Sequence, residues 1–180
     1  MKQRRYVLMD RDGVINYDSE DFIKCPEEWR PIEGSLEGIA LLNKRGYEVV
    51  VITNQSGLAR GLLDESMLAN IHEKMHQMLA EKGGAIAAIY YCPHGQDSLC
   101  NCRKPKPGLF ERFALEKNVD LSGVHFIGDS LRDIQAALVV GAIPLLVKTG
   151  KGQKTLINNP NLNIPVFENL YAAVQHILSE

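Results

Sequence analysis

The sequence lacks the long apolar run that a membrane span requires. A transmembrane helix needs about 20 consecutive apolar residues, and no segment of this 180-residue chain approaches that length. A net charge of only -2 gives no electrostatic reason to expect nucleic acid or an anionic membrane as a partner. The basic start of the chain is followed only by Val7-Leu8-Met9 before Asp10, which is too short for an export signal. We therefore expect a cytoplasmic protein.

The chain also lacks internal repeats, low-complexity runs and interdomain linkers. Its composition, 45% hydrophobic and 23% charged, is typical of globular proteins and argues against disorder. A chain of 180 residues is long enough for one well-filled core and short for two. We expect a single domain over residues 1–180.

Apolar segments of strand length alternate with longer helical patterns. Strands are expected at residues 6–9, 48–53, 86–91, 124–127 and 143–147, and a loop at 150–165. Helices are expected at 35–45, 64–82, 131–140 and 170–178, and another from Pro107 through Phe113. This alternation predicts an α/β fold, a Rossmann-like parallel sheet with helices on both faces. Ligands of such sheets bind beyond the carboxyl ends of the strands.

Two aspartates follow the first predicted strand. Asp10 and Asp12 stand two positions apart just before Gly13, so extended backbone would direct both carboxylates to one side. One carboxylate can act as a nucleophile while the other exchanges a proton with the leaving group. Alone, the pattern also fits a solvated turn.

Polar residues follow three further strands in the same way. Thr53 to Gly57 offers a hydroxyl and backbone amides, Lys104 offers a cation, and Asp129 and Asp133 open a helix. Each has a plainer explanation by itself, as a turn cap, a surface lysine or charges that favour a helix N-terminus. Their joint occurrence, each after a strand, favours a phosphate site.

The order D-x-D-G, T-N, K-P-x-P and G-D-x-x-x-D resembles the haloacid dehalogenase (HAD) superfamily of phosphohydrolases, from Val7 to about Val147. The resemblance implies that Asp10 is the nucleophile and Asp12 the general acid and base. Thr53 and Lys104 would hold the transferring phosphoryl group. Asp12 must be protonated when the leaving oxygen departs, so we expect nearby negative charge to raise its pKa.

The same resemblance implies a catalytic Mg²⁺. Its ligands would be the side chains of Asp10 and Asp129 and the backbone carbonyl of Asp12, with Asp133 orienting the cluster. Few carboxylates, a carbonyl and waters suit this ion. Mg²⁺ and an ammonium group would together offset the repulsion between an attacking carboxylate and a phosphate ester.

A second cluster of metal-ligand types lies between residues 92 and 102. Cys92, His94, Cys100 and Cys102 form the pattern C-x-H-x5-C-x-C, which suits a closed tetrahedral and therefore structural Zn²⁺ site. A cluster of free thiols is the alternative, and the histidine argues against a disulfide. We expect Cys25 to be structural, and His72 and His76 to lie on a packed or solvated helix face.

The zinc loop resembles the branch of the superfamily that holds the heptose bisphosphate and histidinol-phosphate phosphatases. The segments 53–61, 26–29 and 102–108 favour the heptose side. That resemblance implies hydrolysis of the C7 phosphate of a sugar bisphosphate through an aspartyl-phosphate, in the synthesis of nucleotide-activated heptose for lipopolysaccharide. A histidinol-phosphate phosphatase, a nucleic-acid end-processing phosphatase and an inactive zinc-bearing interaction module are the alternatives. The short loop between His94 and Cys100 leaves the anomer preference open.

A bisphosphate substrate needs a second cationic contact for the phosphate that does not react, called here the distal phosphate. Arg103 is the first candidate for the distal phosphate and Arg60 the second. Further candidate substrate contacts are Asp18, Ser19, Glu20 and Asp21 for sugar hydroxyls, with a solvated acidic turn as the alternative, and Asn54, Gln55, Ser56 and Ser130 beside the phosphate. No long insertion separates the motifs, so we expect no large cap domain, and enzymes of this type often act as monomers.

Overall fold

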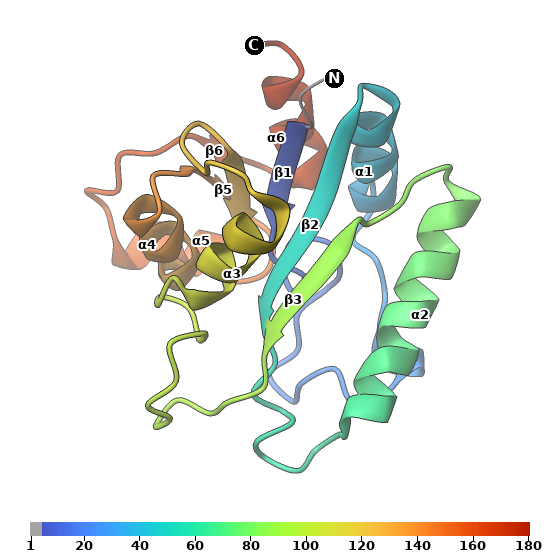
Figure 1. Cartoon of the computed structure of the whole chain (residues 1–180). Helices are drawn as coiled ribbons and strands as arrows, with labels where there is room; N and C mark the ends of the chain where they lie inside the picture. Colours follow the sequence, from blue (N-terminus) through green and yellow to red (C-terminus); the bar gives the residue numbers. More distant parts are fainter. Residues whose placement is uncertain (1–4) are drawn as a thin grey trace.

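The computed structural model describes residues 5–180, which form a six-stranded parallel sheet with helices on both faces (Figure 1). The strands are β1 (Arg5–Met9), β2 (Tyr47–Asn54), β3 (Ala88–Cys92), β4 (His125–Gly128), β5 (Ile143–Val147) and β6 (Val166–Phe167). Their order is β3-β2-β1-β4-β5-β6. The direction of strand progression reverses between β1 and β4, and open parallel sheets bind ligands at such a switch point.

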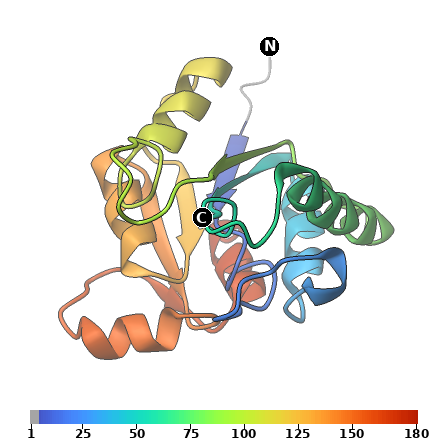
Figure 2. The same cartoon turned by 90° about the horizontal axis from the view of Figure 1, so that it is seen from below.

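The helices cover the two faces of the sheet separately. They are η1 (Pro26–Glu28), α1 (Ser35–Lys44), α2 (Glu65–Glu81), α3 (Gly108–Lys117), α4 (Leu131–Val139), α5 (Gly152–Asn158) and α6 (Leu170–Ile177). Viewed toward the carboxyl ends of the strands, helices flank the sheet on both sides (Figure 2). α1, α2 and α6 contribute to one apolar cluster, and α3 and α4 to the other.

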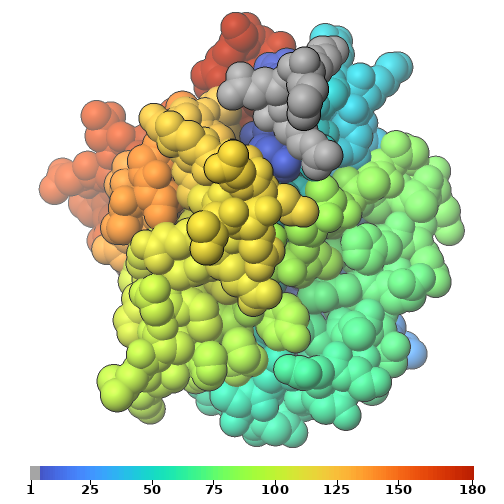
Figure 3. All heavy atoms as spheres, in the orientation of Figure 1, coloured from blue at the N-terminus to red at the C-terminus, as the bar shows by residue number. Residues whose placement is uncertain are grey.

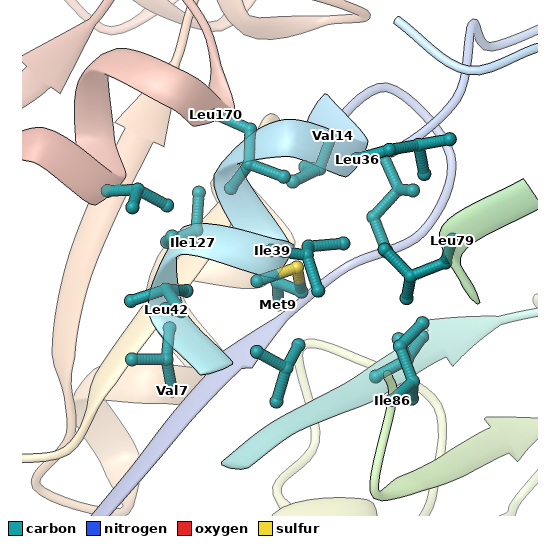
Figure 4. Close-up of a cluster of buried hydrophobic side chains, with 14 of the residues drawn as sticks. Val7, Met9, Val14, Leu36, Ile39, Leu42, Leu79, Ile86, Ile127 and Leu170 are labelled. Carbon is teal, nitrogen blue, oxygen red and sulfur yellow. The ribbon is translucent and has the colours of Figure 1, made fainter. Parts of the chain in front are cut away.

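The first strand shows why the sheet needs both layers. Val7 and Met9 belong to the cluster beneath α1, where Leu36, Ile39 and Leu42 pack (Figure 4). Tyr6 and Leu8 face the opposite cluster, in which the rings of Tyr6 and Phe113 meet edge to face at 5.1 Å. Successive residues of a strand point to opposite faces, so a strand covered on both faces is apolar throughout.

The structure confirms the predicted α/β class and the five predicted strands and five predicted helices, with shifts of a few residues at their ends. Residues 150–165, predicted as a loop, contain α5, so that prediction was wrong. This short helix has no side-chain cap at its N-cap residue Lys151 and buries only Gly152 and Thr155, so it lacks the apolar periodicity that identifies a helix. The two-residue strand β6 and the short η1 were also not predicted.

The loops that follow the strands lie at the edge of the sheet where the carboxyl ends of the strands meet. Within residues 5–180, no folded module is inserted between β1 and β2 or between β3 and β4. In the side view of Figure 3, the loop after β3 lies beside the segment after β2 in the lower part of the molecule. A surface hollow between these two segments is lined by Leu58, Ala59, Gly61, Leu63, Asp64, Glu65, Pro93 and His94. No helix of this described part is long and apolar enough to cross a membrane.

Candidate active site

A cleft of about 330 Å³ opens at the carboxyl ends of β1, β2 and β4. It brings together most of the residues predicted for the site: Asp10, Asp12, Asp18, Ser19, Glu20, Asn54, Gln55, Ser56, Arg103, Lys104, Asp129, Ser130 and Asp133. Thr53, Asp21 and Arg60 do not line it. The cleft also takes in Phe22, Ile23, Arg132 and Lys151, none of which was predicted.

Lys104 is the charged centre of this cleft. Its side chain is only 2% exposed, and its ammonium lies 3.1 Å from Asp10 Oδ2 and 2.7 Å from Asp133 Oδ1. Its third donor reaches the carbonyl of Ile52 at 2.8 Å. Burial alone would lower the pKa of Lys104, but the two carboxylates outweigh it and raise that pKa. The lysine is therefore held charged next to Asp10.

Asp10 has too little positive charge around it to offset its burial. Burial raises its pKa to about 7, with Asp133 and Asp12 adding to the effect and Lys104 opposing it. The main-chain amide of Arg11 donates to Asp10 Oδ1 at 2.7 Å. A carboxylate in this position is ready to accept more positive charge, which a bound cation would supply.

Asp129 lies in a cradle of backbone that leaves no room for other side chains. A Cβ built on Gly13 would lie 2.0 Å from Asp129 Oδ2, and one on Gly150 would lie 2.2 Å from it. Both glycines have positive φ, +79° and +56°, which suits glycine alone at such close approach. The amide of Lys151 donates to the same oxygen at 2.8 Å, so Oδ1 is the oxygen left for a ligand.

The donor set of the cleft fits a hard divalent cation. Carboxylate oxygens of Asp10, Asp129 and Asp133 lie within 4.8 Å of one another, and Asp10 and Asp129 have raised pKa values, first because of burial and then because of their acidic neighbours. Asp133 is already engaged: one oxygen contacts Lys104, and the other accepts from the amides of Asp129 and Ser130 and from the Ser130 hydroxyl. Both oxygens of Asp133 therefore already have partners, and Asp10 and Asp129 have the carboxylate oxygens that remain available to a cation.

The carboxyl of Asp12 has a lowered pKa, so the expectation that its pKa is raised was wrong. Burial raises the pKa, but Arg11 outweighs it, helped by hydrogen bonds from Asn16 and Gln55. Arg11 donates to Asp12 Oδ1 from Nε at 3.0 Å and from Nη2 at 2.8 Å. The prediction considered only nearby negative charge, whereas the intervening Arg11 is fully buried and bonds this carboxylate.

Side chains that follow β2 connect the parts of the site by hydrogen bonds. The Asn54 side chain bonds both main-chain groups of Lys104, accepting from its amide at 3.0 Å and donating to its carbonyl at 3.2 Å. Gln55 Nε2 donates to Asp12 Oδ2 at 2.9 Å and to Thr53 Oγ1 at 3.1 Å. Asn54 thus fixes the backbone that carries the lysine, and Gln55 ties Thr53 to Asp12.

The cysteine–histidine cluster forms as the spacing predicts. Cys92 Sγ lies 3.1 Å from Cys102 Sγ, 3.8 Å from Cys100 Sγ and 3.5 Å from His94 Nδ1. Ligands about 2.3 Å from a tetrahedral ion are about 3.8 Å apart, so the four donors fit zinc. Burial raises the pKa of Cys92 to about 12, while the Cys100 pKa falls to about 6 because hydrogen bonds, first from the Arg103 amide, outweigh burial.

Arginines gather beside the cleft. Arg103 donates from Nη1 to the carbonyl of His94 at 3.3 Å, and its pKa is lowered by burial and then by the nearby charges of Arg132 and Arg60. Arg60 itself lies over the Phe22 ring at 5.3 Å. On the opposite side, Lys151 pairs with Asp18 at 3.4 Å. The excess of cations near Arg103 favours an anionic group.

The sequence-based prediction missed residues that reach the cleft from elements without a motif. Arg132 lies between Ser130 and Asp133 in α4, one position from the acidic pattern, so its place on that helix was a usable signal. Lys151 belongs to the segment predicted as a loop. Thr149, just before that segment, supports the loop after β1, because its Oγ1 donates to the Gly13 carbonyl at 2.6 Å. Nothing in the sequence pairs these residues with the first strand.

Three comparisons with known proteins agree with this geometry. A family model described as HAD-hydrolase-like matches residues 101–173. The chain is 49% identical over 180 residues to D-glycero-beta-D-manno-heptose-1,7-bisphosphate 7-phosphatase of Bordetella bronchiseptica, covering 98% of this chain and 99% of that protein. It is 48% identical over 174 residues to the Pseudomonas putida protein of the same name, covering 97% and 99%.

Solved structures are similar over the same length. The crystal structure of D,D-heptose 1,7-bisphosphate phosphatase from B. bronchiseptica, complexed with magnesium and phosphate, matches with a TM-score of 0.95 and 49% identity and covers 97% of this chain and 98% of that one. The corresponding structure from Burkholderia thailandensis matches with a TM-score of 0.78 and 39% identity, covering 98% and 100%.

Proposed function

Because the chain belongs to the D-glycero-beta-D-manno-heptose-1,7-bisphosphate 7-phosphatase family of HAD-like hydrolases, we propose that it hydrolyses the C7 phosphate of that sugar bisphosphate to leave the 1-phosphate. The near full-length identity of 49% to a protein of this name supports the substrate. The observation that carries the chemistry is the buried Lys104, 3.1 Å from the carboxylate of Asp10. In this proposal Asp10 is the nucleophile, and the cation that offsets its charge lies in contact with it.

Asp10 attacks the phosphorus of the C7 phosphate. Its Oδ–P bond forms as the bond between phosphorus and the sugar oxygen breaks. Lys104 and the Thr53 hydroxyl hold the phosphoryl oxygens in this proposal. Asp12 gives a proton to the departing sugar oxygen and later takes one from the water that hydrolyses the aspartyl-phosphate. Since the charge of Arg11, helped by hydrogen bonds, lowers the pKa of Asp12 in the free protein, the approach of the substrate's negative charge must raise that pKa so that Asp12 takes up a proton before it donates one.

The oxygens of Asp10 and Asp129 and the backbone carbonyl of Asp12 would hold Mg²⁺, with Asp133 orienting them. When bound, Mg²⁺ would supply positive charge to the transferring phosphoryl group. A related structure that contains magnesium and phosphate supports this assignment. The four donors of Cys92, His94, Cys100 and Cys102 would hold Zn²⁺ in a structural role; the thiol and imidazole distances support this choice.

The distal phosphate is assigned to Arg103, with Arg132 beside it. Both line the cleft, and within residues 5–180 the Arg103 guanidinium forms no salt bridge with a carboxylate. Asp18, Ser19, Glu20, Ser56 and Ser130 also line the cleft and are the proposed contacts of the sugar. Asp21 and Arg60, which lie outside the lining, rank below them. The named relatives act on the beta anomer, and we propose the same preference here.

The protein is further proposed to act as a monomer in the cytoplasm, in the synthesis of nucleotide-activated heptose for lipopolysaccharide. Zinc held by thiolates is favoured in a reducing compartment. The net charge of -2 gives no support for nucleic acid as a partner.

The decisive experiment measures phosphate release from D-glycero-beta-D-manno-heptose 1,7-bisphosphate with Mg²⁺. We expect the 1-phosphate as the only sugar product, and a kcat/KM well above that for the 7-monophosphate, since only the bisphosphate engages Arg103. Arg103→Ala should remove this difference and leave the monophosphate rate unchanged. Faster turnover of histidinol phosphate, or equal rates on the two heptose phosphates, would contradict the proposal.

A further inference from the structure

Behind Asp12 lie Arg11, which bonds its carboxylate, and a buried histidine that has no part in the chemistry described so far. Arg11 is 0% exposed, and His72, on the inner side of α2, is 8% exposed. The distance between Arg11 Nη1 and His72 Nε2 is 3.2 Å. The guanidinium also donates to Asp12 Oδ1, through Nε and Nη2, and to Gln55 Oε1 at 3.3 Å.

We propose that His72 is a positioning residue for the general acid and base, which it serves by fixing the Arg11 guanidinium that grips Asp12. This inference rests on the proposed phosphatase function. A guanidinium carries only donors, so the imidazole must be neutral and accept at Nε2, with its proton on Nδ1. Burial, the charge of Arg11 and then that of His76 lower the pKa of His72 to about 3, which is consistent with a neutral ring.

The geometry explains why such a support is needed. Arg11 Nε and Nη2 both donate to Oδ1 of Asp12, while Oδ2 receives only the Gln55 amide at 2.9 Å. Oδ2 is therefore the oxygen that exchanges the proton with the substrate. If Nη1 lost its buried acceptor, the guanidinium would turn to satisfy it elsewhere, and the Asp12 carboxylate would lose its orientation.

His72 is carried by a helix that is itself fixed to the rest of the chain. Lys74 Nζ, also on α2, donates to the carbonyls of Pro26 and Trp29 at 2.6 and 2.8 Å. Asp64 caps the start of α2 by accepting from the Met67 amide at 2.7 Å. The imidazole thus stands on a rigid support, as a positioning group requires.

The test compares two leaving groups in His72→Leu, which removes the acceptor, and His72→Gln, whose amide oxygen can replace Nε2. kcat/KM should fall at least about tenfold for the sugar bisphosphate in His72→Leu. For p-nitrophenyl phosphate, whose leaving group departs without a proton, it should fall less than about threefold. His72→Gln should recover most of the sugar phosphate activity. His76→Leu, one turn further along α2, is the matched control and should behave as the wild type.

Equal losses on both substrates, or no loss on either in a folded His72→Leu protein, would overturn the inference while leaving the phosphatase function intact. If that variant does not fold, nitrogen NMR of the wild-type imidazole decides the point without activity. We expect His72 to be neutral with an unprotonated Nε2. A proton on Nε2 would overturn the inference, whereas an inactive wild-type protein would instead refute the proposed function.

Discussion

Replacing Lys104 with methionine tests the charge balance of the site most directly. Methionine keeps most of the side-chain volume and removes only the ammonium that lies 3.1 Å from Asp10 and 2.7 Å from Asp133. Removing one partner of a buried ion pair costs about 3–5 kcal/mol, and here one cation serves two carboxylates. We therefore expect Lys104→Met to lower the free energy of unfolding by about 3 kcal/mol or more at pH 8 without metal.

The stability lost on replacing Lys104 should be larger at high pH than at low pH. In the wild type, burial is outweighed by Lys104, which lowers the pKa of Asp133, so this pair stabilises the fold above the carboxyl's unfolded pKa and loses that effect as the pH falls. In the variant, Asp10 and Asp133 both have raised pKa values, and protonation relieves their repulsion as the pH falls. The stability difference between the two proteins should therefore be largest near pH 8 and smaller at pH 5.

Urea unfolding at the two pH values measures this difference, and phosphate release with Mg²⁺ measures activity. kcat should fall about a thousandfold or more, because a preorganised charge on the transferring phosphoryl group is lost. Lys117→Met, on the exposed surface of α3, is the matched control. A Lys104→Met protein with normal kcat, or with equal stability losses at pH 5 and pH 8, would refute the role assigned to this lysine.

Three further variants probe the remaining parts of the site. Asp10→Asn should abolish phosphate release yet raise the midpoint of metal-free thermal unfolding at pH 8, because it removes a buried carboxylate; residual turnover would point to another nucleophile. Cys102→Ser should reduce bound zinc from about one ion per chain to a small fraction in elemental analysis; unchanged zinc would argue against this ligand set. Gly13→Ala should destabilise the fold by about 2 kcal/mol or more in urea, since its Cβ would lie 2.0 Å from Asp129 Oδ2 at a φ of +79°; wild-type stability would contradict the tight cradle.

The sequence was most informative where one local rule decides the outcome. The β-branched run 49–52 could only be a strand covered on both faces, and the structure places it at the centre of β2. The motif residues converge for an equally simple reason, because the carboxyl ends of parallel strands meet at one edge. The cysteine spacing likewise places four donors within 4.8 Å of one another.

The sequence was least informative where an effect depends on contacts between distant segments. The pKa of Asp12 follows from the inward direction of Arg11, which its interaction with His72 on α2 helps to fix, and no local pattern reveals that direction. α5 escaped prediction because its position is set by a few polar contacts, such as Thr155 Oγ1 to the Asp129 carbonyl at 3.0 Å. The partners of a buried ionisable group must be known before the direction of its pKa shift can be predicted.

The close packing of Gly13 and Gly150 around Asp129 has a consequence for the order in which parts of the protein fold. Thr149 reaches Gly13 across 136 positions of sequence, so the loop after β1 acquires its final support only when the segment after β5 has arrived. Closing contacts of such long range is slow compared with forming local helices. During refolding, helical content should recover well before magnesium-dependent turnover, and a chain caught between those two moments would be compact but inert.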